Sequence, residues 1–164
     1  MESVFRPSRL EFVARPEGPF CHLPDLASHD FEALKTPVLY RKGTTLFREG
    51  QPAHDIFVVS EGRVRLSISS ESGRRLTLRI AGPGEILGLS AALAGGPHEM
   101  MAELLEDGQL AMIRRKDLLS FLREHREACL QVVHLLSQDL HIAYDRVRSL
   151  GLARTRRPRT SRLQ

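Results

Sequence analysis

Residues 62–84 read GRVRLSISSESGRRLTLRIAGPG, and this stretch decides the fold. Apolar and polar residues alternate in it twice, over 63–68 (RVRLSI) and over 75–80 (RLTLRI). A period of two is that of a strand with one buried face. The pattern therefore predicts two strands that bury Val64, Leu66, Ile68, Leu76, Leu78 and Ile80.

Glycine recurs at regular intervals around this stretch. Gly50, Gly62, Gly73 and Gly84 are 12, 11 and 11 residues apart. Glycine accepts the positive φ angles that tight turns between strands require. Strand-like runs also surround Tyr40, Leu46 and Phe47, residues 56–59 and residues 110–113. Many short strands separated by turns are typical of a sandwich or barrel, and we predict a compact β-roll here.

Helical periodicity replaces this pattern at both ends. We predict short helices over 24–35 and 116–124, and a long helix over 126–152 that Gly151 ends. Apolar residues of the long helix step alternately by four and three, which is the seam of a coiled coil. The predicted dimer interface is Cys129, Val133, Leu136, Leu140, Ala143, Val147 and Leu150. One wide apolar face buried within a monomer is the alternative.

Length and composition exclude several classes of protein. The 164 residues suit one domain with an appendage. No run reaches the 18 apolar residues of a membrane span, and the first residues do not form a signal peptide. Two cysteines, Cys21 and Cys129, make no disulfide framework. We therefore expect a cytoplasmic protein without a membrane partner.

The net charge of +4 is unevenly distributed. From Arg146 onward there are seven arginines and no acidic residue, whereas the preceding 145 residues hold 17 basic and 20 acidic residues. The basic character is thus confined to one end. We predict a flexible arm over 1–22, a β-roll domain over 23–125, a dimerisation helix over 126–152 and a disordered arginine-rich tail over 153–164.

A set of glycines, apolar residues and a few polar residues marks the predicted roll: Lys42, Gly43, Leu46, Phe47, Gly50, Ile56, Phe57, Val58, Ser60, Glu61, Gly62, Gly73, Leu76, Gly84, Glu85, Gly88 and Leu93. Through these residues the chain resembles, over about residues 22–152, the sensor half of the CRP/FNR family of bacterial transcription regulators. The resemblance implies a mainly β fold with helices (α+β). This is the double-stranded, jelly-roll-like β-roll of the cyclic-nucleotide-binding fold, followed by a long dimerisation helix. It also implies regulation of transcription and not an enzyme.

Cyclic-nucleotide-binding members of that family carry a phosphate-binding cassette at the position of Gly88. A short helix offers N–H groups to the cyclic phosphate, an arginine pairs with its charge, and a glutamate takes a ribose hydroxyl. Here Leu89 replaces the glutamate, and Met100 and Met101 replace the arginine and its neighbour. We therefore expect a degenerate cassette that does not bind cyclic AMP in the familiar way. The ligand-binding residues that the resemblance implies are Gly88, Leu89, Ser90, Ala91, Met100, Met101, Ala102 and Tyr144.

Several hypotheses about the ligand of these residues stay open. The chain is a functional cyclic-nucleotide binder if backbone contacts suffice, or a purely structural module if Leu89, Met100 and Met101 fill the pocket. His98 beside the two methionines also admits haem or a lipid-like ligand. We predict no metal site, and no cofactor follows with certainty from the residues; a cyclic nucleotide stays open. An iron–sulfur cluster needs more cysteines, and a metal enzyme of the cupin type needs a His-x-His pair that this sequence lacks.

The resemblance to the CRP/FNR family also implies binding partners. CRP/FNR members continue past the dimerisation helix into a winged helix-turn-helix. We expect no such module in this chain, because residues 154–164 have no apolar period and contain Pro158. DNA is thus a partner only through a module absent here. The expected partners are a second copy or a full-length relative, with a small-molecule effector. A stand-alone protein-interaction module is the alternative.

Overall fold

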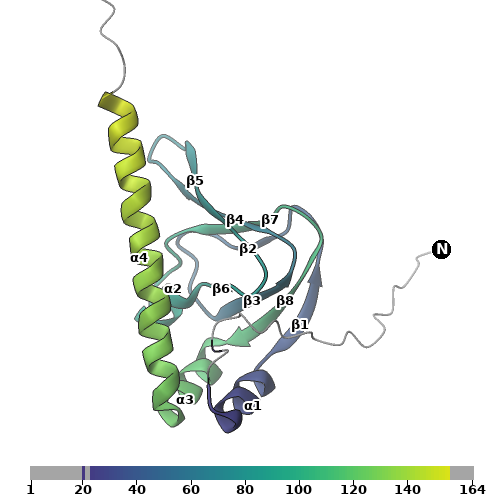
Figure 1. Cartoon of the computed structure of the whole chain (residues 1–164). Coiled ribbons are helices and arrows are strands. Elements are labelled where there is room, and N and C mark those ends of the chain that lie inside the picture. Colours follow the sequence, from purple (N-terminus) through teal and green to yellow (C-terminus); the bar gives the residue numbers. More distant parts are fainter. Residues whose placement is uncertain (1–19, 21–22, 156–164) are drawn as a thin grey trace, which may run out of the picture.

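The structure, a computed structural model, describes residue 20 and residues 23–155 (Figure 1). Eight strands and four helices lie in this described part of the chain. Their order is α1 (Asp25–Ala33), β1 (Thr36–Tyr40), β2 (Thr45–Phe47), β3 (Asp55–Glu61), β4 (Val64–Ser69), β5 (Arg75–Ala81), β6 (Ile86–Leu87), α2 (Leu89–Ala94), β7 (Met101–Leu104), β8 (Gly108–Arg114), α3 (Arg115–Glu124) and α4 (Arg126–Thr155).

The strands form two four-stranded antiparallel sheets, which confirms the predicted β-roll. One sheet has the order β1-β8-β3-β6 and the other β2-β7-β4-β5. Strand β8 pairs with both β1 and β3, and β7 pairs with both β2 and β4. Consecutive strands therefore alternate between the sheets in places and wind the chain into a roll, with α4 along one side (Figure 1).

Strand β3 is buried on both faces, which explains its uninterrupted apolar run. Ile56 and Val58 pack into a core shared with the helices. Phe57 and Val59 point the other way, into the core between the sheets. Side chains alternate across a strand, so a strand at the centre of two cores needs apolar residues at every position.

Strands β4 and β5 depart from a simple alternation of buried and exposed residues. Ser67, which alternation places on the polar face, is 2% exposed and lies beside a register shift in the pairing of β4 with β5. In β5, Ile80 was predicted to be buried but is 50% exposed. The period-two pattern located both strands correctly, whereas the burial of individual residues in them does not follow the alternation.

An aromatic cluster joins the N-terminal helix to the C-terminal ones. Phe20, Phe31 of α1 and Phe121 of α3 contact one another, with ring centroids 4.7 to 6.2 Å apart. Phe20 is 5% exposed, so the prediction of a flexible arm is wrong at this residue. The remainder of 1–22 lies outside the described residues. Leu26 of α1 lies outside this cluster and is 69% exposed.

Helix α4 begins where predicted and runs to Thr155, past the expected end at Gly151. A glycine inside a helix costs about 1 kcal/mol relative to alanine. This cost at Gly151 alone is too small to end a helix of this length. Residues 153–155 are thus helical and not part of a disordered tail, and residues 156–164 lie outside the described part. In the described chain, no helix is both long and apolar enough to cross a membrane.

Candidate ligand-binding site and helix face

Gly88 positions the short helix that opens the candidate site. It adopts φ 82° as the N-cap of α2, a conformation that side-chain-bearing residues rarely take. A Cβ added there would lie 3.1 Å from Cε1 of His98. The glycine therefore serves both the turn and the close approach of the His98 ring. This local geometry fixes where α2 starts.

A cavity of about 460 Å³ lies between the roll and α4. This volume is within the range of small-molecule sites. Most of its lining is apolar, and α4 supplies one wall. The lining residues are Phe47, Leu66, Leu78, Arg79, Ile86, Leu87, Gly88, Leu89, Ser90, His98, Glu99, Met100, Leu136, Asp139, Leu140, Ile142, Ala143 and Arg146.

The predicted site residues fall into two groups. Gly88, Leu89, Ser90 and Met100 line the cavity. The lining residues do not include the other four. Ala91 and Ala102 are buried, Met101 begins β7, and Tyr144 lies on α4 with half of its surface exposed. Half of the predicted cassette residues thus line the cavity. The lining residues that β5 and the polar side of α4 supply were not predicted.

Arg79 and Asp139 form a charged link between β5 and α4. Arg79 is paired with Glu85, and its Nη2 lies 3.5 Å from Oδ1 of Asp139. Burial, and to a lesser extent the nearby Glu85, raises the pKa of Asp139, while Arg79 opposes this shift. The positive charge of Arg79 is therefore matched by acidic groups of the protein itself. Alternation had placed Arg79 simply on the polar side of a strand.

Arg146 is the second arginine on the cavity wall, and it lacks an acidic partner. Its Nη2 donates to the carbonyl oxygen of Thr77 in β5 at 3.1 Å. Its Nε–H is buried without a hydrogen-bond partner in the described structure. Among the ion pairs of the described residues none involves Arg146, and the adjacent Asp145 pairs with Arg148 instead. A half-buried guanidinium thus keeps unused donor capacity.

His98 lies between the cavity and the β2 strand. Its ring stacks on Phe47 with centroids 3.9 Å apart, and the residue is 5% exposed. Its backbone N–H donates to Gln51 and its carbonyl accepts from Gly50, so the loop is tied to the β2–β3 turn. Burial lowers the pKa of His98, and the nearby Glu99 only partly offsets this. The geometry makes His98 a packing residue of the cavity wall.

The lowered pKa of His98 predicts a loss of stability in acid. The unfolded chain takes up a proton at this residue more readily than the folded chain, so the free energy of unfolding should fall as the pH drops below about 6.5. His98→Phe keeps a ring on Phe47 and removes the proton site. Urea unfolding at pH 7.5 and pH 5.5 should show a smaller pH-dependent loss for the variant. Equal losses in both proteins would contradict the prediction.

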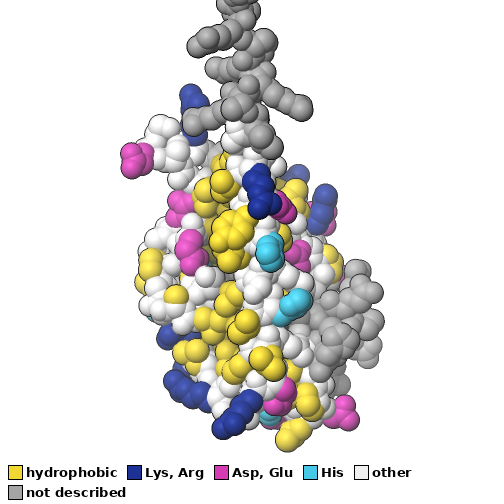
Figure 2. All heavy atoms as spheres, turned by 60° about the vertical axis from the view of Figure 1, so that its left-hand side comes forward, with side chains coloured by type: hydrophobic (Ala, Val, Ile, Leu, Met, Phe, Trp, Pro, Cys, Tyr) yellow, Lys and Arg dark blue, Asp and Glu magenta, His cyan; other side chains and the backbone are white. Residues whose placement is uncertain are grey.

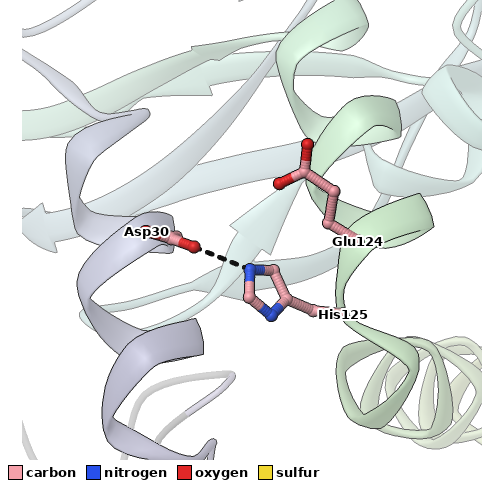
Figure 3. Close-up of side chains that lie close together, drawn as sticks. All are labelled: Asp30, Glu124 and His125. Atoms are coloured by element: carbon pink, nitrogen blue, oxygen red, sulfur yellow. Dashed lines mark hydrogen bonds and ion pairs between the residues drawn. The ribbon is translucent and has the colours of Figure 1, made fainter.

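A second polar cluster lies at the junction of α1, α3 and α4 (Figure 3). His125 Nε2 lies 2.8 Å from Asp30 Oδ2, and Glu124 lies close by, with ligand-type atoms of all three within 4.8 Å of one another. His125 is the extended residue that separates α3 from α4. Its hydrogen bond to α1 accounts for the cluster as a structural link, and we assign no metal to it.

The predicted interface residues of α4 are mostly uncovered. Val133, Leu140, Val147 and Leu150 are 42 to 68% exposed, and Cys129 and Ala143 are exposed as well. Figure 2 shows apolar side chains along this face of the helix. Val132 and Leu135 instead pack on the chain's own core, and Leu136 is half-buried. The first residue of the predicted interface, Cys129, is thus also exposed within one chain.

Two antiparallel sheets rolled together, a short helix opening at Gly88 and a long closing helix define the cyclic-nucleotide-binding fold. The family model of the cyclic nucleotide-binding domain matches residues 37–125, which is more than half of the chain. The chain therefore belongs to this family. The resemblance to CRP/FNR regulators stated from the sequence is confirmed by its relatives.

One curated relative is the "Cyclic AMP receptor protein" of Thermus thermophilus, 31% identical over 109 residues, or 63% of this chain and 50% of the relative. The "Anaerobic regulatory protein" of Bacillus subtilis is 29% identical over 133 residues, covering 78% of this chain and 56% of the relative. The crystal structure of the Thermus thermophilus catabolite activator protein superposes with a TM-score of 0.72 and 26% identity over 80% of this chain and 62% of that one. The chain thus spans about half the length of these two curated relatives.

Proposed function

We propose that this chain is the effector-sensing and dimerisation domain of a CRP/FNR-type transcription regulator, with a degenerate phosphate cassette and no enzymatic activity. A second copy or a full-length relative would pair along the exposed face of α4, in the cytoplasm. A ligand in the cavity would favour one of two positions of α4 relative to the roll. Because α4 would also form the dimer interface, the ligand would thereby change how the two chains are arranged. Contact with DNA would require a helix-turn-helix module.

The observation that carries the proposal is the cavity between the roll and α4. Leu136, Leu140 and Ala143 of the helix line it. The same three residues belong to the predicted seam. A ligand that contacts these side chains would therefore act directly on the surface through which two chains pair. A purely structural module would not need this open space.

The degenerate cassette has a physical basis in the site. The Leu89 side chain is 4% exposed and offers no acceptor for a ribose hydroxyl. Ser90 donates its hydroxyl to Glu99 Oε1 at 3.2 Å, which places a carboxylate next to the start of α2. A cyclic phosphate would meet this negative charge instead of an arginine. Loss of the charge-assisted contact should weaken binding by about 100-fold or more.

Calorimetric titration with cyclic AMP and cyclic GMP, with the mass in solution measured on the same sample, tests this proposal. We expect a dimer that binds neither nucleotide in the micromolar range. Micromolar binding of either nucleotide would overturn the degenerate cassette and favour a functional cyclic-nucleotide binder. A monomeric chain at high micromolar concentration would overturn the dimerisation role.

A further inference from the structure

We infer that the cavity beside α4 binds an amphipathic ligand with an apolar body and a single negative charge, such as a medium-chain carboxylate, and that Arg146 holds the charged group. The inference rests on the proposed function, since it assigns the ligand of the same cavity. It is carried by two independent features of the wall, its apolar character and the unpaired arginine.

The apolar body follows from the lining. Leucine, isoleucine, phenylalanine and methionine side chains supply most of the wall, from both sheets and from α4. Leu66 and Leu78 come from β4 and β5, and Leu140 comes from the helix opposite. A strongly polar body such as a ribose would find few partners for its hydroxyls there, and unpaired polar groups are costly to bury.

The single negative charge follows from the balance of charged groups around the cavity. Arg79 is matched by Glu85 and Asp139, whereas Arg146 has no acidic partner among the described residues. One anionic group would use its free donors. A second charge on the ligand would be repelled by Asp139 and by Glu99, which also line the cavity. The site therefore fits a monoanion better than a dianion.

The position of Arg146 separates this site from the cassette. Arg146 lies on α4 and is hydrogen-bonded to β5, whereas Glu99 is hydrogen-bonded to Ser90 at the start of α2. Figure 1 shows β5 and α2 against different parts of α4. The charged group of the ligand would thus lie at the β5 end, away from Glu99, and its body would extend toward α2. Such a ligand would use the free donors of Arg146 and add a second bridge between α4 and the roll, beside the hydrogen bond to Thr77.

Calorimetric titration of the full chain with dodecanoate and with dodecan-1-ol, both below the concentrations at which they aggregate, tests the inference. We expect micromolar binding of dodecanoate and about tenfold weaker binding of the uncharged alcohol. Arg146→Gln should weaken dodecanoate binding by about tenfold or more and leave the alcohol unchanged. Arg148→Gln is the matched control. It removes an exposed arginine from the same helix, one paired with Asp145, and should bind as the wild type does.

Circular dichroism of Arg146→Gln will show that the variant is folded before its affinity is compared. Equal affinities for the carboxylate and the alcohol, or equal losses in both arginine variants, would overturn the role of Arg146. No binding of either compound to the folded wild type would overturn the amphipathic ligand. Failure of the proposed function is distinguishable, because it appears as a monomeric mass or as cyclic-nucleotide binding in the same samples.

Discussion

Val133→Glu is expected to convert the proposed dimer into monomers while leaving the fold of each chain intact. Val133 is 60% exposed in the isolated chain, so a carboxylate there stays solvated after folding. In a parallel pair of helices, residues at this seam position face their own copies. Two carboxylates would then be buried against each other, at a cost of several kcal/mol. The dissociation constant should rise about 100-fold or more.

Sedimentation equilibrium over a range of concentrations measures this effect. Gln138→Glu is the matched control, because it adds the same charge to the same helix at an exposed position two residues before Leu140, off the seam. The control should keep the mass of a dimer. If both variants remain dimers, the chains pair through another surface. If the wild type is already a monomer, the exposed apolar face of α4 needs a different explanation.

Phe121→Ala is expected to lower the free energy of unfolding by about 3–5 kcal/mol, the largest effect on stability that we predict. Phe121 is 3% exposed and contacts both Phe31 and Phe20, with ring centroids 5.4 and 6.2 Å away. Its ring also lies 4.7 Å from that of His125, where α4 begins. Removing the ring leaves a cavity at the point where α1, α3 and α4 meet.

Urea unfolding at a fixed chain concentration measures this loss, since the stability of a dimer depends on concentration. Leu26→Ala removes a large side chain from α1 that is 69% exposed, and it should change the free energy of unfolding by less than about 0.5 kcal/mol. Comparable losses in the two variants would show that the aromatic cluster does not hold the helices on the roll.

The sequence predicted the fold where its signal is local. Period-two alternation located β4 and β5, and glycine spacing located the turns around them. Steps of four and three predicted the long helix and the face of it that one chain leaves exposed. Gly88 was singled out through the resemblance to the family cassette, and the αL conformation that it adopts in the structure suits glycine. Each of these features depends only on residues close together in the chain.

Other features were decided only by the tertiary structure. The burial of Phe20 depends on Phe121, a hundred residues away in sequence, and the register shift beside Ser67 depends on the pairing of β4 with β5. No local period reports either of them. The same holds for the candidate site. Arg79 meets Asp139 across 60 residues, and Arg146 meets Thr77 across 69. Whether a charge is paired or left free depends on which distant groups the fold brings beside it. The sequence alone therefore determined the roll and the helix face, and the packing of α4 on β5 decided which arginine remains available to a ligand.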